Sequence, residues 1–183
     1  MTPEEYKQLK AFVSQDGIYL GALWVLSFAC LIGEFKFQIL GTIGIVLAII
    51  SPILVVKRLK RYRDWGLGGN ISFRRALFYC LMLFLYASLL FALVQYIYFQ
   101  FIDNGYLLQQ YNLIMSSPNM QEMIKVYNIK EQMEEGLSTM ASMTSIEKVA
   151  NIMSVNIFTG IMLSIPIAIM MRRSNVRNNI STQ

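Results

Sequence analysis

The residues best suited to chemistry are basic and aromatic side chains gathered in one stretch, residues 57–75. Five arginines in this stretch could hold a phosphate group through charge-assisted hydrogen bonds: Arg58, Arg61, Arg63, Arg74 and Arg75. Tyr62, Trp65 and Phe73 lie among them, and aromatic rings of this kind anchor proteins at membrane surfaces. The pattern allows a site for a phosphorylated lipid. The competing interpretation, which we favour, is that these charges only orient a membrane protein.

Other kinds of chemistry lack their usual residues. The sequence contains no His and only two Cys, which excludes His-based catalysis, His metal clusters, zinc knuckles and a disulfide framework. Gly66, Gly68 and Gly69 do not form a nucleotide-binding loop, because the Lys-Ser/Thr ending and the preceding strand are missing. Thioethers can bind Cu(I), so the Met-rich segment from Met115 to Met153 is compatible with copper binding or with flexible apolar packing. We expect no enzyme, no cofactor and no catalytic residue.

The composition is typical of a membrane protein. Of the 183 residues, 55% are hydrophobic and 15% are charged, whereas a soluble domain carries roughly 25% charged residues. Four uncharged apolar runs approach the length of about 20 residues that a helix needs to cross a bilayer. They cover residues 17–33, 37–56, 76–102 and 150–171. We therefore predict an all-α membrane protein with four transmembrane helices, and we expect the first run to stay as an anchor.

The distribution of charge predicts the orientation in the membrane. Residues 57–75 are strongly basic, whereas residues 103–149 carry more acids than lysines. Cytoplasmic loops retain Lys and Arg, so we predict that residues 57–75 and the basic tail, residues 172–183, are cytoplasmic. Residues 103–149 are then extracytoplasmic, and both termini face the cytoplasm. The net charge of +5 follows from this topology and requires no nucleic-acid partner.

The first part of the chain is predicted to begin with a separate helix. Residues 1–16 read as a cytoplasmic amphipathic helix, in which Thr2 and Glu5 form a capping box and Pro3 occupies the first helical position. Its apolar face is expected on the membrane or on the basic stretch. Residues 17–56 are predicted to be a hairpin of two spans, and residues 76–102 form the third span.

Residues 103–149 are predicted to form a small helical crown between the third and fourth spans. We expect the third span to continue as a stalk as far as Ser116. One helix over residues 120–137 should follow, with Asn119 and Glu122 as its capping box. Thr144 and Glu147 should cap a second helix that runs directly into the fourth span, residues 150–171.

Small residues recur at helical spacing in two of the spans. Such residues let helix backbones approach closely in lipid, so they are predicted to be packing faces. The second span contributes Gly41, Gly44 and Ala48, and the fourth contributes Asn156, Gly160 and Ser164. Pro52 and Pro166 are expected to bend these two helices.

The order of these features resembles one bacterial family of membrane proteins, domain of unknown function 4199. The resemblance rests on the two closely spaced first spans, on Arg61-Tyr62-Arg63-Asp64 at the end of the basic run, and on Gly69-Asn70-Ile71-Ser72-Phe73 before the third span. It extends over nearly the whole chain, including the acidic, Met-rich segment before the last span. The resemblance implies a four-helix membrane protein and brings no known activity.

Two functions are consistent with the sequence. The first is a noncatalytic inner-membrane protein, an assembly, scaffolding or accessory subunit that binds a protein partner or a second copy through its small-residue faces and crown. The alternative is a lipid-handling protein that binds or moves a polyprenyl phosphate or a phospholipid through the five arginines. Membrane lipids are expected as partners in both cases.

Overall fold

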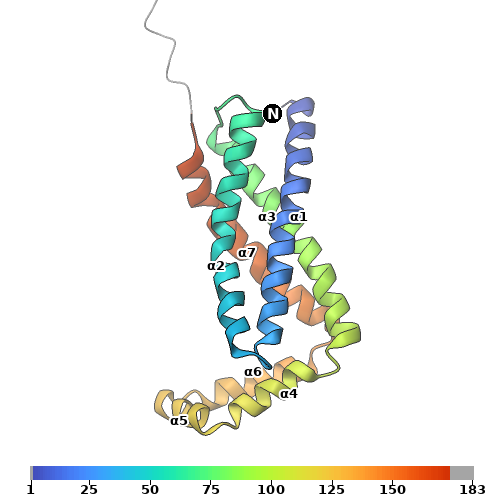
Figure 1. Ribbon diagram of the computed structural model, residues 1–183, viewed down its shortest axis with the longest axis vertical. Coiled ribbons are helices and arrows are strands. Elements are labelled where there is room, and N and C mark those ends of the chain that lie inside the picture. Colours follow the sequence, from blue (N-terminus) through green and yellow to red (C-terminus); the bar gives the residue numbers. More distant parts are fainter. Residues whose placement is uncertain (1, 174–183) are drawn as a thin grey trace, which may run out of the picture.

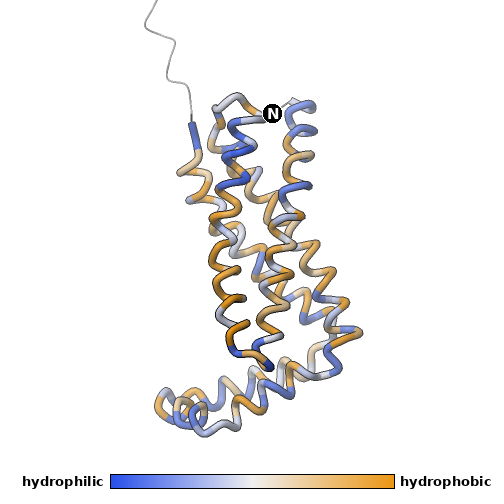
Figure 2. Tube along the Cα trace, in the orientation of Figure 1, coloured by the Kyte–Doolittle hydropathy of each residue, from blue (hydrophilic) through white to orange (hydrophobic). Residues whose placement is uncertain are grey.

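The computed structural model describes residues 2–173, and four long helices form its main bundle (Figure 1). Each is long and apolar enough to cross a membrane. They are α1 (Pro3–Gly33), α2 (Gln38–Arg61), α3 (Phe73–Ile97) and α7 (Ser145–Met171). Short π-helical turns extend two of them, η1 (Tyr62–Gly66) after α2 and η2 (Tyr98–Ile102) after α3. The predominance of hydrophobic residues along these helices (Figure 2) indicates a multi-pass membrane protein.

Three shorter helices cross one end of the bundle (Figure 1). They are α4 (Tyr106–Met115), α5 (Pro118–Tyr127) and α6 (Lys130–Ser142), and we call them the crown. The opposite end, formed by η1, residues 67–72 and the adjoining helix termini, is called the basic end. Every named element among residues 2–173 is a helix, and Ile71 and Arg173 form an isolated β-bridge. Most of the predicted basic tail, from residue 174 onward, lies outside the described residues.

The predicted N-terminal helix and the first span form one continuous helix, α1. Its capping box is confirmed, with Thr2 Oγ1 accepting from Glu5 N at 3.2 Å and Glu5 Oε2 accepting from Thr2 N at 2.8 Å. Leu9 and Val13 are buried in the core. The apolar face at the start of α1 therefore packs against the basic end of the same protein.

The predicted stalk is wrong, because the chain turns sharply between η2 and α4. Asn104 and Gly105 have φ angles of 42° and 82°, in the left-handed region that ends a right-handed helix. Asp103 stabilises the turn, since its Oδ1 accepts from Leu107 N at 3.0 Å. The crown therefore runs across the bundle rather than along its axis.

The single helix predicted over residues 120–137 is also wrong. Asn128 has a φ of 51° and ends α5, and Asn is one of the few residues that adopt this conformation readily. The predicted Asn119–Glu122 capping box is absent, because α5 already starts at Pro118 after Ser117. The Thr144–Glu147 capping box at the start of α7 is confirmed.

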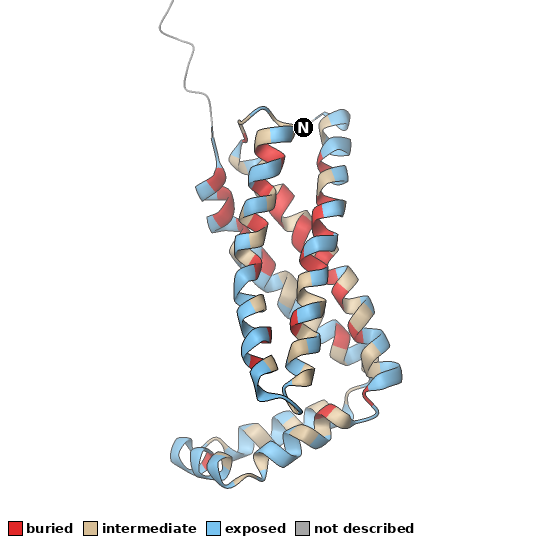
Figure 3. Cartoon of the chain, viewed as in Figure 1, coloured by how far each residue is buried: buried red, intermediate tan, exposed pale blue. Residues whose placement is uncertain are grey.

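The buried core lies mainly in the half of the bundle toward the basic end (Figure 3). α3 packs most extensively against α7, and α1 packs against both α2 and α3. Contacts between α2 and α7 are sparse. Fewer residues are buried in the half of the bundle near the crown (Figure 3).

Candidate functional site

The five arginines predicted to bind phosphate lie at the basic end, but three of them already have acidic partners. Arg58 Nη1 is 3.4 Å from Asp16 Oδ1, Arg63 Nε is 2.7 Å from Asp64 Oδ1, and Arg75 Nη2 is 2.5 Å from Glu5 Oε1. A guanidinium held by a carboxylate must give up that contact before it can bind a phosphate. These three arginines are therefore less suited to a lipid phosphate than the sequence indicates.

Arg61 and Arg74 remain available as surface cations. Both are exposed, and neither forms an ion pair with another of residues 2–173. The Arg61 guanidinium carbon lies 5.8 Å from the centroid of the Trp65 ring. Trp65 itself is 82% exposed, as an aromatic anchor at a lipid surface would be.

The basic end also contains a buried cluster centred on Asp16, which the sequence analysis did not identify. Asp16 is only 1% exposed. Its Oδ2 accepts a hydrogen bond from the Tyr79 hydroxyl, and its Oδ1 faces Arg58. The Tyr79 ring stacks on Tyr62 with centroids 4.9 Å apart and an interplanar angle of 12°. The Arg58 guanidinium carbon lies 3.9 Å from the centroid of the Tyr19 ring.

A buried carboxylate is unfavourable unless a counter-charge and hydrogen bonds compensate for lost hydration. Here the compensation comes from two other helices, because Arg58 belongs to α2 and Tyr79 to α3. The cluster combines the Asp16 carboxylate, the Arg58 guanidinium and the Tyr79 hydroxyl. Its chemistry is that of an ionic lock, which fixes the positions of α1, α2 and α3 relative to one another.

One signal in the sequence marks Asp16 as buried. Leu9, Val13, Asp16 and Leu20 follow one another at spacings of four, three and four residues, which places them on one face of a helix. Three of the four positions are apolar, so the acid falls within the face that packs inward. Leu20 joins this face only if residues 3–33 are treated as one helix.

The start of α1 also covers the basic end. Gln8 Nε2 donates to the carbonyl of Gly66 at 2.9 Å, and the Phe12 and Tyr62 ring centroids are 5.2 Å apart. The N-terminal residues therefore hold η1 against the bundle and limit the surface that remains for a ligand.

The predicted packing residues of α2 occupy different environments. A Cβ on Gly44 would lie 2.9 Å from Leu31 Cγ of α1, and Ser27 Oγ donates across the same contact to Gly44 O at 2.8 Å. A Cβ on Gly41 would lie 2.5 Å from the Glu34 side chain. Ala48 is exposed. Gly41 and Gly44 thus let α1 and α2 approach closely, whereas Ala48 does not lie at that contact.

Among the predicted packing residues of α7, Gly160 lies directly against α3. A Cβ on Gly160 would lie 2.7 Å from Phe84 Cγ and 2.8 Å from Phe84 Cβ. Ser164 is buried, and its hydroxyl donates to Gly160 O at 2.6 Å. Asn156 is partly buried. The close approach at Gly160 explains why α3 and α7 form the most extensive helix contact of the bundle.

Pro52 lies inside α2, where its ring nitrogen cannot donate to the carbonyl of Ala48. The neighbouring hydroxyl replaces that donor, because Ser51 Oγ donates to Ala48 O at 2.7 Å. α2 continues through the proline to Arg61.

The fold and the basic end together define a multi-pass helical membrane protein with an internal ionic lock. A family model described as a protein of unknown function (DUF4199) matches residues 15–173, and the chain belongs to this family. The matched segment contains Asp16, Arg58 and Tyr79. Comparisons with curated proteins and with solved structures gave no match.

Proposed function

We propose that this protein is a noncatalytic accessory or scaffolding subunit of the bacterial inner membrane, and that its crown binds a protein partner. The exposure of α5 carries the proposal. Met123, Val126 and Tyr127 are all exposed, Val126 to 72%, and Ile124 is the one buried residue of this helix. α5 lies to the side of the bundle (Figure 1), so the long helices do not cover these side chains.

The composition of α5 fits an interface with a protein. Three large apolar side chains within one ten-residue helix would form the centre of a contact, and the neighbouring Glu122 and Lys125 are exposed and would form its polar rim. Single exposed apolar residues need no explanation, but adjacent ones on a surface often mark a binding site. A second copy of the chain is one form that the partner can take.

The proposed orientation places the basic end in the cytoplasm and the crown on the outer side. The basic end contains Lys57, Lys60 and the five arginines, and positive charges of this kind remain on the cytoplasmic side. The start of α1 and the end of α7 lie at the same end of the bundle (Figure 1), which is the basic end, so this orientation puts both ends of the described chain inside. The partner would then meet the crown outside the cytoplasm.

The test is co-purification from native membranes in detergent-free polymer discs. A stoichiometric protein should accompany the wild type and be lost from Val126→Glu, because the new carboxylate would have to be desolvated at the contact. Ser138→Glu adds the same charge at an exposed position of α6 and should retain the partner. Equal recovery from both variants would contradict the proposal.

The alternative function is the binding of a phosphorylated lipid at the basic end. The exposure of Arg61 and Arg74 favours it, with Trp65 close to Arg61, and the pairing of Arg58, Arg63 and Arg75 counts against it. A lipid phosphate would be held by Arg61 and Arg74, with Lys57 and Lys60 supplying further positive charge.

This alternative is tested by replacing both arginines, Arg61→Gln with Arg74→Gln, and measuring the lipids that co-purify. Loss of one enriched phosphorylated lipid would support it. The variant Lys130→Gln removes a charge from the crown and serves as the control. An unchanged lipid profile in the double variant would exclude a phosphate site at these two residues.

A further inference from the structure

A cleft of about 540 Å³ is lined by α6 of the crown, by the first turns of α7 and by Phe99 of η2. Its volume falls in the range of roughly 300–1,000 Å³ that is typical of small-molecule sites. The Ser145 hydroxyl donates to the carbonyl of Phe99 at 3.2 Å, which joins the start of α7 to η2. The cleft therefore lies where the crown meets the bundle, and we call it the crown cleft.

Two opposite charges line the crown cleft. Glu135 comes from α6 and Lys148 from α7. Glu135 is exposed and Lys148 is half-buried, and neither forms an ion pair with another of residues 2–173. The Lys148 ammonium nitrogen lies 5.8 Å from the centroid of the Phe99 ring, which places this charge at the wall of the cleft. The cleft thus presents one accessible anion and one accessible cation to a ligand.

The crown cleft lies at the level where the membrane spans end. Lys148 is the last charged residue before an uncharged run that continues to Met171, and lysines near the ends of spans reach toward the lipid headgroups. Ile152, one turn further along α7, lines the same cleft. A ligand in the cleft would therefore meet charged groups at the headgroup level and apolar groups on the side of the acyl chains.

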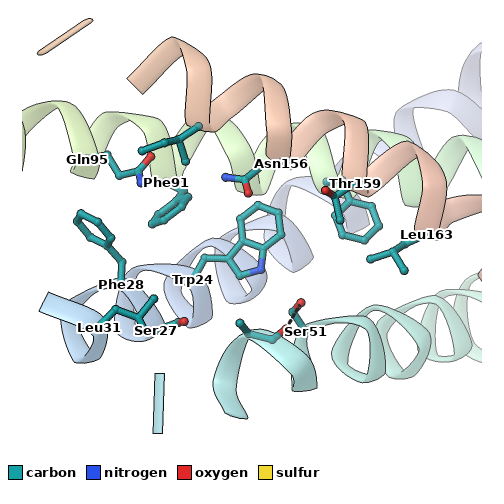
Figure 4. A pocket seen from close by; sticks show the side chains of 14 residues that line it. Trp24, Ser27, Phe28, Leu31, Ser51, Phe91, Gln95, Asn156, Thr159 and Leu163 are labelled. Carbon is teal, nitrogen blue, oxygen red and sulfur yellow. Dashed lines mark hydrogen bonds between the residues drawn. The ribbon is translucent and has the colours of Figure 1, made fainter. Parts of the chain in front are cut away.

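Two further cavities, lined mostly by apolar residues, adjoin the crown cleft. The first, of about 280 Å³, shares Phe99, Met140 and Ile152 with the cleft. The second, of about 410 Å³, shares Phe28, Leu31 and Ile152 with the first. It lies among the long helices, and aromatic rings form much of its wall (Figure 4). Charged groups at the crown are thus followed by apolar space, an arrangement that suits a lipid with a charged headgroup and a hydrocarbon chain.

A zwitterionic headgroup matches the two charges of the crown cleft. Its phosphate would bind Lys148, and its ammonium group would bind Glu135. The ammonium group of phosphatidylethanolamine can donate three hydrogen bonds, as that of a lysine does. Phosphatidylglycerol has no cation for Glu135 and would bring its negative charge close to this carboxylate, which is unfavourable. The pair of charges therefore favours an ethanolamine headgroup over a glycerol headgroup.

We propose that the crown cleft binds phosphatidylethanolamine, with its headgroup between Glu135 and Lys148 and one acyl chain in the two adjoining cavities. The proposal does not depend on the protein partner of the crown, which would contact α5. It also differs from the phosphorylated lipid at the basic end, because the site lies at the opposite end of the bundle and requires a cation in the ligand.

The experiment uses the full chain in nanodiscs of phosphatidylglycerol. The probe is phosphatidylethanolamine with a photoreactive diazirine near the end of one acyl chain, and the matched control is phosphatidylglycerol with the same chains. The ethanolamine probe should label Trp24 or Phe91 about fivefold more than the control does, the effect of one accessible ion pair. Unlabelled phosphatidylethanolamine should compete with it. Equal labelling by both probes, or a preference confined to the exposed Ile49 and Ile53 of α2, would overturn the proposal.

Two variants test the charges directly. Glu135→Gln should remove the preference for the ethanolamine probe, and Lys148→Gln should reduce labelling by both probes about fivefold. Glu134→Gln removes an exposed carboxylate of α6 that pairs with Lys130, and it should be labelled as the wild type is. A preference that persists in Glu135→Gln, or undiminished labelling of Lys148→Gln, would overturn the proposal. If a variant misfolds, the comparison of the two probes on the wild type still decides the outcome.

Discussion

Tyr79 of α3 donates its hydroxyl hydrogen bond to Asp16 of α1, across a separation of 63 residues in the sequence. The other oxygen of the same carboxylate lies 3.4 Å from Arg58 Nη1 of α2. One buried side chain thus connects three of the four long helices. Because the cluster lies at the basic end, it stabilises the helix ends that carry most of the positive charge.

Replacing Asp16 should destabilise the bundle strongly. Asp16→Ala leaves the partly buried Arg58 without its counter-charge, and removing one member of a buried ion pair costs about 3–5 kcal/mol. We expect about 3 kcal/mol, the lower end of this range, because the Arg58 side chain is 21% exposed. Asp16→Asn should cost less, since the amide oxygen still accepts from Tyr79. Equilibrium unfolding in mixed micelles measures both values.

The coupling between Asp16 and Tyr79 is testable by a double-mutant cycle. Tyr79→Phe alone should cost about 1.5–3 kcal/mol, the range for a hydrogen bond to a charged group. The free energy of unfolding should fall clearly less in the Asp16→Ala, Tyr79→Phe double variant than the sum of the losses in the two single variants. Both substitutions remove the same interaction. Additive free energies of unfolding would show that the hydrogen bond contributes nothing.

Gly160 and Gly136 form a matched pair for testing helix packing. Gly160→Leu should destabilise the protein by about 1–3 kcal/mol, as overpacking does, because Phe84 leaves no space for the new side chain. Gly136 in α6 has no atom within 4 Å of an added Cβ. Gly136→Leu should therefore stabilise α6 by about 0.5–1 kcal/mol through helix propensity. Similar unfolding free energies for the two variants would refute close packing at Gly160.

Asp103 should control the start of α4. Asp103→Ala removes the acceptor of the Leu107 amide, and the loss of a capping side chain typically costs about 1 kcal/mol. We expect hydrogen exchange in residues 106–115 to accelerate about fivefold, because fraying exposes these amides. Asp103→Asn retains an acceptor oxygen and should exchange nearly as the wild type does. Equal exchange rates in residues 106–115 of all three proteins would show that Asn104 and Gly105 maintain the turn without Asp103.

The proposed orientation is testable with single cysteines in a Cys30→Ser, Cys80→Ala background. Ser138→Cys in the crown should react with a membrane-impermeant maleimide in intact spheroplasts. Lys60→Cys at the basic end should react only after permeabilisation, because the positive charges hold that end inside. The reverse labelling pattern would show that the topology is inverted and that the crown lies in the cytoplasm.

The amino-acid sequence alone predicts the features that depend on neighbouring residues. The four spans follow from uncharged runs of bilayer length, and the caps at Thr2 and Thr144 involve residues only three positions apart. The breaks at Gly105 and Asn128 were also local. The sequence does not predict these breaks, because helical periodicity on both sides of Asn104-Gly105 and of Asn128 favours continuous helices.

Only the tertiary structure decided which charges are buried and which remain available. Asp16 meets Arg58 and Tyr79 because three helices pack in one relative register, and that register depends on close contacts such as Gly17 against Tyr86 and Gly44 against Leu31. The same packing brings Glu5 to Arg75. A sequence pattern reports the types of side chains present, but ion pairs depend on distances between segments far apart in the chain. For this reason the sequence predicts the arginine-rich stretch. It does not predict which of these arginines are paired and which are exposed.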